Sequence, residues 1–180
     1  MCPDLAKLVC GKKATYDNLY AAFSAICDAV EGPLRLCGLS LGGVLALHYA
    51  AEHPGRVSAL VLISAQYQMP KKLLSVQNAV FRLMPSSVFQ QMGFQKEDVL
   101  SLCQTMAKLD LSTSIHKISC PCMVVCGGRD HANKRASAKL AGMLKNAEFH
   151  VLNGVGHEVN IEAPEELAEL LFAFYNKNAN

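Results

Sequence analysis

Short apolar runs alternate with helical patterns over most of the chain. Each run is too short for a helix, and Val57–Ile63 is apolar at nearly every position, so both of its faces must be buried. Strands of this kind that alternate with helices are typical of a parallel sheet between layers of helices. We therefore expect an α/β fold with a mostly parallel sheet and helices on both faces. The predicted strands are Pro33–Cys37, Val57–Ile63, Cys122–Cys126 and Glu148–Leu152.

Helical periodicity fills the segments between these strands. Apolar residues from Leu19 to Val30 recur at the spacing of one helical stripe, in a helix that opens at Thr15. The last helix carries two acidic residues in its first turn, where the helix dipole favours negative charge. The other helices of the alternation are expected at Val44–Ala51, at 133–145 and from Pro164 onward.

The segment from 67 to 112 interrupts the alternation of strands and helices. It is rich in Met and Phe at helical spacing. We expect it to form a helical lid inserted into a core of residues 1–66 and 113–180. At the start of that core, Cys2–Leu5 is expected to be extended and Lys7–Lys13 to be a loop.

A serine between glycines follows the first predicted strand. The segment Gly38–Gly43 has the form of a nucleophile elbow, a tight strand-to-helix turn that lifts its serine clear of the backbone. Such a turn needs very small residues two positions before and two positions after Ser40, and Gly38 and Gly42 meet that requirement. A glycine-rich turn without chemistry is the alternative interpretation, but the strand before it and the helix after it favour the elbow.

Two further residues complete a catalytic constellation. A serine hydroxyl needs a base to take its proton, and the base works best when a carboxylate fixes its tautomer. Ser40, Asp130 and His157 each follow the carboxyl end of a predicted parallel strand, the edge at which sites of open α/β sheets form. Asp110 is a rival for the acid. His131 is expected to face solvent rather than line the site.

At these residues the chain resembles the α/β-hydrolase family over nearly all of its length. Gly38–Gly43 is similar to the family's elbow, and the segment from Pro121 to Asp130 is similar to its acid-bearing strand and loop. Gly156–Glu158 together with Glu162–Pro164 resembles its histidine loop. The order Ser, then Asp, then His is also that of the family.

The resemblance implies a role for each of these residues. Ser40 is the nucleophile, His157 the general base and then acid, Asp130 the orienting acid, and the N–H of Leu41 one oxyanion donor. We therefore expect a serine hydrolase that cleaves an ester or related acyl bond of a small, partly hydrophobic substrate through an acyl-enzyme, without a cofactor. The candidate substrate contacts are Leu39, Met84, Met92 and Met106, although the methionines also follow the spacing of a helical core.

The chain departs from the family at its N-terminus. Cys2–Leu5 resembles the piece after the family's fourth strand, so the first strands and the loop with the second oxyanion N–H have no counterpart here. The alternative function is therefore a catalytically weak remnant or fragment that acts as a binding or scaffold module. Because residues 34–39 would then form an unpaired apolar edge, we expect a homodimer or higher assembly through it.

The composition limits which kinds of partner and ligand are expected. The net charge of +2 comes from 17 basic and 15 acidic residues without a basic run, so nucleic acid is not an expected partner. No apolar run approaches the ~18 residues of a membrane span, and a cytoplasmic location is expected. The eight cysteines fit a reduced protein. Cys120, Cys122 and Cys126 do not have the spacing of a zinc site, so no metal is expected.

Overall fold

The computed structural model describes residues 1–69, 71–91 and 93–179. Contacts divide the chain into two compact units, of which the first consists of Met1–Glu31 with Gln68–Asp110 and the second of Gly32–Tyr67 with Leu111–Asn180. The first 31 residues therefore group with the helical insertion, whereas the sequence pattern assigned them to the core. A role of the insertion as a lid stays a prediction.

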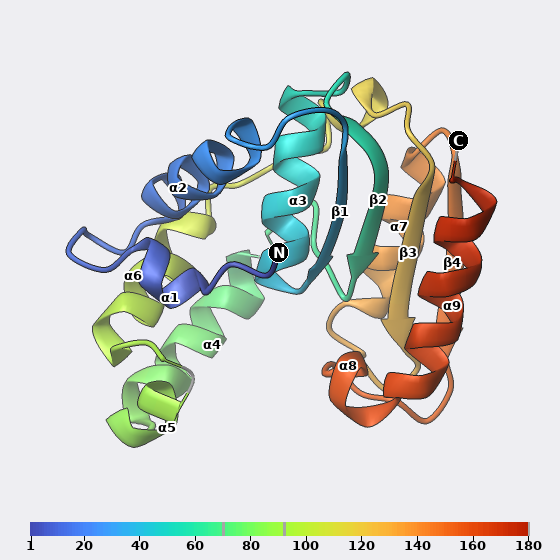
Figure 1. The fold of residues 1–180 in the computed structure, drawn as a ribbon. Coiled ribbons are helices and arrows are strands. Elements are labelled where there is room, and N and C mark those ends of the chain that lie inside the picture. The colour runs from blue at the N-terminus through green and yellow to red at the C-terminus, as the bar shows by residue number, and fades with distance from the viewer. Residues whose placement is uncertain (70, 92, 180) are drawn as a thin grey trace. The chain divides into compact units, whose positions relative to one another are not determined.

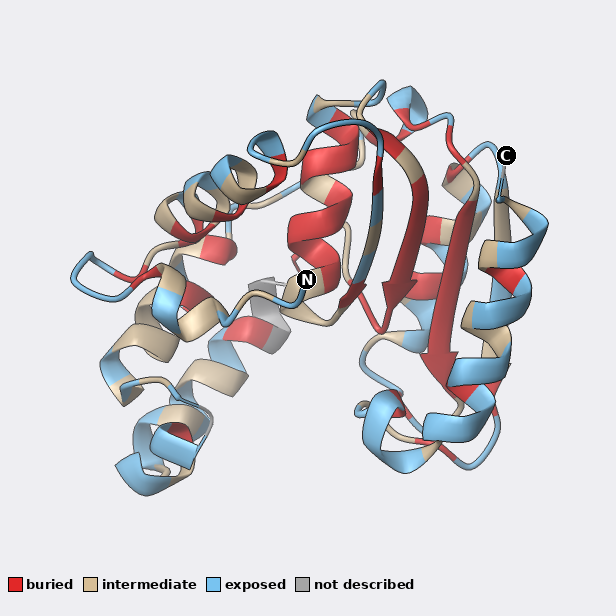
Figure 2. Cartoon of the chain, in the orientation of Figure 1, coloured by how far each residue is buried: buried red, intermediate tan, exposed pale blue. Residues whose placement is uncertain are grey.

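The second unit contains the sheet. Its described residues form four parallel strands in the order β1-β2-β3-β4 (Figure 1), which confirms the α/β fold class. The strands β2 and β3 are buried along almost their whole length (Figure 2), as their apolar runs predict. β1 is one edge of the sheet, and assembly through this edge stays a prediction. The strands are β1 (Leu34–Leu39), β2 (Val57–Ile63), β3 (Cys122–Gly127) and β4 (Ala147–Leu152).

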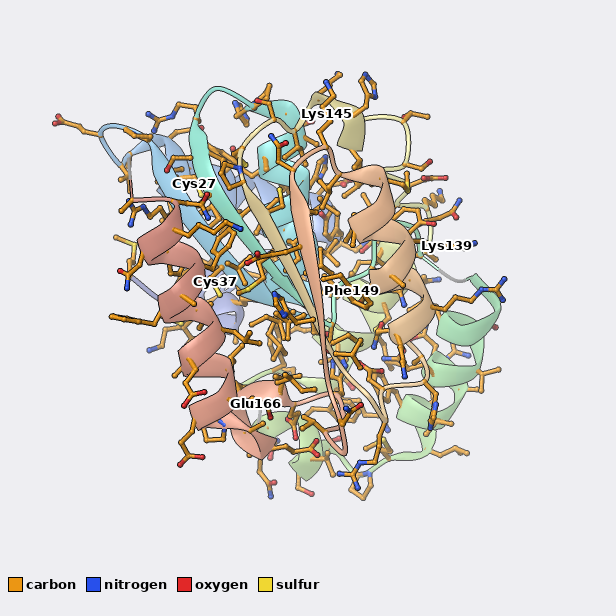
Figure 3. The ribbon with its side chains drawn as sticks, turned by 90° about the vertical axis from the view of Figure 1, so that its right-hand side faces the viewer. Cys27, Cys37, Lys139, Lys145, Phe149 and Glu166 are labelled. Atoms are coloured by element: carbon orange, nitrogen blue, oxygen red, sulfur yellow. The ribbon has the colours of Figure 1, made fainter. Side chains whose placement is uncertain are left out.

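Helices cover both faces of this sheet. Figure 3 looks toward β4, with α9 and its Glu166 on one side of the sheet and α7 and its Lys139 on the other. α9 packs on the face that carries the alternate residues Val61, Met123 and Val125. Around this sheet lie α3 (Leu41–Glu52), the 3-10 turn η1 (Ile115–Lys117), α7 (Lys134–Met143), α8 (Val159–Glu162) and α9 (Pro164–Lys177).

The first unit is helical. Thr15 caps its second helix by accepting a hydrogen bond from the N–H of Asn18, and the N–H of Tyr16 donates to Thr105 Oγ1 at 2.9 Å. Within the described ranges of the whole chain, no helix combines the length and the apolarity that a bilayer span requires. The helices are α1 (Leu5–Leu8), α2 (Tyr16–Asp28), α4 (Lys71–Leu83), α5 (Ser86–Gln91) and α6 (Lys96–Met106).

The first helix, α1, is a correction to the sequence prediction of extended chain and loop. The carboxylate of Asp4 accepts hydrogen bonds from the N–H groups of Ala6 at 3.1 Å and Lys7 at 3.3 Å. It thereby satisfies two of the donors that the first turn of a helix leaves open. A single turn is too short to show an apolar period, which is why the pattern did not reveal it.

Candidate active site

Ser40 occupies the turn between β1 and α3. Its backbone has φ 51° and ψ −116°, an unusual conformation for a residue with a side chain, and its N–H donates to the carbonyl of Ile63 at 2.8 Å. Its own carbonyl accepts from the N–H of Val44 at 3.0 Å, so the helix begins immediately after it. Leu41 is therefore in the first turn of α3, whose N–H groups have no partner within the helix.

The elbow glycines differ in how closely other atoms approach them. A Cβ on Gly38 would overlap the backbone of Gly42 and Gly43, and one on Gly43 would lie 2.7 Å from the Cβ of Ala65. A Cβ on Gly42 would meet nothing within 4 Å. The sequence argument that the residue two positions after Ser40 must be small is therefore wrong for this chain. The crowded position is instead Gly43, where a Cβ would lie 2.8 Å from the carbonyl oxygen of Gly38.

Asp130 and His157 are in direct contact. His157 Nδ1 lies 2.7 Å from Asp130 Oδ2, with the acid side chain 4% exposed and the histidine side chain 40% exposed. Burial opposes ionisation of Asp130, but hydrogen bonds from His157 and Asn133 outweigh it and lower the pKa of the carboxyl group. The contact gives a carboxylate that can hold a proton on Nδ1 and leave Nε2 free to act as a base.

The loops that carry the acid and the histidine are tied to each other. The N–H of Arg129 donates to the carbonyl of Val155 at 2.8 Å. The carboxylate of Glu162 accepts from the N–H of Gly156 at 2.9 Å and from the guanidinium of Arg129 at 3.0 Å. A Cβ on Gly127 would overlap the carbonyls of Val155 and Gly156, so only glycine allows the two loops to come this close.

The lowered pKa of Asp130 predicts a loss of stability in acid. A carboxyl that ionises at lower pH in the folded than in the unfolded state stabilises the fold above its unfolded pKa, 3.8, and loses that contribution as the pH falls through the folded pKa. Asp130→Asn should therefore flatten the stability curve below about pH 3.8, as urea unfolding would measure. Asp17→Asn, at an exposed position, should leave the curve steep, and an equal slope in both variants would contradict the prediction.

The structure does not bring all of the other predicted candidate residues into the same unit. Asp110, Met84 and Met106 belong to the first unit, where Asp110 accepts a hydrogen bond from Gln68 Nε2 at 2.6 Å. Met92 lies outside the described residues. Leu39 is in the second unit and packs against the core beneath α9. The structure thus places Ser40, Asp130 and His157 in one unit, after the carboxyl ends of β1, β3 and β4, and His131 is exposed.

Three polar residues beside Asp130 had no role in the sequence analysis. Ser64 follows β2 with a positive φ of 48° and is 1% exposed, and its hydroxyl also favours the ionised form of Asp130. Asn133 stands three residues after the acid, a spacing that could have suggested a local hydrogen bond. Gln66 reaches Asn133 from the loop after β2, and no sequence signal indicates this contact.

The cysteines of the predicted strand at 122–126 are buried thiols, together with Cys120. A hydrogen bond with Cys120 and burial raise the pKa of Cys122, and burial raises that of Cys126. Across the residues that the structure describes, no three His, Cys, Asp or Glu side chains gather as a metal site would require.

The fold and these motifs define a protein class. The Alpha/beta hydrolase family model matches residues 2–170, and the chain belongs to this family. Monoacylglycerol lipase abhd6-B of Xenopus laevis is 27% identical over 183 residues, which cover 79% of this chain and 54% of that protein. Pyrrolizixenacetamide deacetylase of Xenorhabdus hominickii is 25% identical over 197 residues, covering 91% of this chain and 74% of that protein.

Solved structures show the same fold. A thermophilic esterase from Thermogutta terrifontis superimposes with a TM-score of 0.74 at 20% identity, over 92% of this chain and 74% of that chain. The chain spans about half the length of the monoacylglycerol lipases that it matches. The family resemblance that the sequence motifs indicated is therefore confirmed, along with the fold.

Proposed function

We propose that this protein is a serine hydrolase that cleaves an ester or related acyl bond of a small, partly hydrophobic substrate through an acyl-enzyme. The observation that carries the proposal is the hydrogen-bonded pair of Asp130 and His157, which lies, like Ser40, after the carboxyl ends of the parallel strands. Relatives that are named a lipase and a deacetylase, and a structural neighbour named an esterase, support an acyl bond as the target.

The proposed reaction needs no cofactor. Ser40 Oγ attacks the acyl carbon while His157 Nε2 takes its proton, and the Asp130 carboxylate stabilises the charge that forms on the imidazole. The N–H of Leu41 donates to the oxyanion. His157 then returns the proton to the leaving group, and a water molecule activated by the same histidine releases the acyl group and regenerates Ser40.

A second candidate function is a catalytically weak binding or scaffold module of the same fold. The observation that favours it is the partial coverage of the lipase relatives, of which the chain spans 54%. Within the described residues we identify one oxyanion donor, the N–H of Leu41 in the first turn of α3. Loss of one such donor costs about 10²–10³ in rate, so a weak enzyme and a binding module differ in measurable turnover.

Labelling with a fluorophosphonate probe tests the proposal. The wild-type protein should be labelled, and Ser40→Ala should lose both the label and at least about 10⁴-fold of its turnover of short p-nitrophenyl esters. Ser58→Ala is the matched control, because Ser58 lies near the start of β2, where its hydroxyl donates to the carbonyl of Leu34 at 3.1 Å, and it should still be labelled. Equal labelling of wild type and Ser40→Ala would refute the proposal. Labelling without ester turnover would favour the binding module.

A further inference from the structure

Asp130 accepts more hydrogen bonds than the one from His157. The side-chain Nδ2 of Asn133 lies 2.9 Å from each of its two carboxylate oxygens, and the backbone N–H of Asn133 donates to Oδ1 at 3.2 Å. Asn133 thus spans the whole carboxylate with one amide group. Hydrogen bonds to an ionised acceptor are among the strongest in proteins.

The orientation of the Asn133 amide follows from Gln66. The carbonyl of Ala132 can only accept, and it lies 3.2 Å from Gln66 Nε2, so the amide nitrogen of Gln66 must face this loop. The same nitrogen donates to Asn133 Oδ1 at 2.7 Å. Asn133 therefore turns its oxygen toward Gln66 and its NH₂ group toward Asp130. A flipped Asn133 would instead place an oxygen against the carboxylate.

This arrangement selects one tautomer of His157. Asn133 Nδ2 also lies 3.1 Å from His157 Nδ1, and it would donate there if that nitrogen had no proton. Asp130 Oδ2 lies closer to that nitrogen, at 2.7 Å, and as a carboxylate oxygen it can only accept, so the proton of His157 remains on Nδ1 and points to it, while Asn133 Nδ2 donates to the carboxylate. Nε2 then keeps its lone pair.

We infer that Asn133 and Gln66 are positioning residues for the reaction: Asn133 holds the Asp130 carboxylate toward His157, and Gln66 acts through Asn133 by fixing its amide. The inference rests on the proposed function, in which Asp130 and His157 serve Ser40. It connects the loop after β2 to the acid loop after β3, so the ends of all four described strands take part in the site.

Kinetics of single and double variants test the inference. Asn133→Ala should lower kcat about tenfold, because a charge-assisted hydrogen bond to Asp130 is lost. It should change KM less than about twofold, because Asn133 is not proposed to contact the substrate. Asn133→Asp keeps the shape but removes the donor, so its kcat should fall further. Gln66→Ala should lower kcat about threefold alone, and not at all in the Asn133→Ala background. A full additional loss in the double variant would overturn the role of Gln66.

Asn146→Ala is the matched control, since Asn146 Nδ2 donates to the carbonyl of Ser119 at 2.8 Å, elsewhere in the same unit. Its kcat should be unchanged, and comparison of the Tm values separates lost positioning from lost folding. The ¹⁵N chemical shifts of the His157 ring report its tautomer without turnover. They should indicate Nδ1–H in wild type and a mixture in Asn133→Ala. Unchanged shifts together with full kcat in both Asn133 variants would overturn the inference, whereas turnover by Ser40→Ala would refute only the proposed function.

Discussion

Asp130→Asn is expected to lower the kcat for p-nitrophenyl esters about 10⁴-fold with little change in KM. The amide that replaces the carboxylate would present either an NH₂ group or an uncharged oxygen to His157 Nδ1, which lies 2.7 Å from Oδ2. An NH₂ group would move the proton of His157 to Nε2, and the ring could no longer accept the proton of Ser40. The charge that stabilises the imidazolium in the transition state would also be lost.

The matched control is Asp110→Asn. Asp110 was the rival acid, and its carboxylate accepts a hydrogen bond from Gln68 in the first unit. We expect this variant to keep its kcat within about twofold, the range of a surface substitution. A large loss in Asp110→Asn and a small one in Asp130→Asn would assign the acid to Asp110.

The elbow turn has no space for a side chain at Gly38. Gly38→Ala is expected to reduce the free energy of unfolding by about 3 kcal/mol or more, because the new Cβ would overlap backbone atoms that cannot move separately from the turn. These atoms belong to Gly42 and Gly43, which open α3. Urea unfolding followed by far-ultraviolet circular dichroism would measure the loss, and labelling of Ser40 should fall in parallel.

Gly42→Ala is the control within the same turn. A Cβ there meets nothing within 4 Å, and Gly42 lies inside α3. Alanine has the higher helix propensity, so this variant should be neutral or up to about 1 kcal/mol more stable. A severe loss in Gly42→Ala would instead support the family motif's size requirement at that position.

The sheet could be predicted from sequence because burial on both faces leaves a direct mark on composition. The strand β2 has the predicted bounds, Val57–Ile63, and β4 extends only one residue beyond the prediction, to Ala147. The placement of Ser40, Asp130 and His157 after strands of one sheet could be predicted for a related reason, since each comes within a few residues of the end of such a strand. The order of strands does not determine which of these side chains touch. The contact that the structure gives among them is the one between Asp130 and His157.

Contacts between separate loops could not be predicted in this way. Gln66 and Asn133 are polar residues in loops, and their hydrogen bond depends on how the ends of β2 and β3 meet. The wrong assignment at Gly42 has a similar cause, because the need for a small residue depends on which backbone atoms approach it. The grouping of Met1–Glu31 with the insertion likewise depends on packing between distant segments.

At Ser40 the conformation that presents the proposed nucleophile reduces the stability of the fold. A side chain at φ 51° costs about 1–3 kcal/mol, and Ser64 at φ 48° adds a second strained serine at the end of the next strand. Domains have only about 5–15 kcal/mol of net stability, so these two turns consume a sizeable share of it. Glycine would relieve the strain at Ser40 but would remove the hydroxyl group. The well-packed core beneath this sheet edge therefore compensates for a conformation that folding alone would not favour.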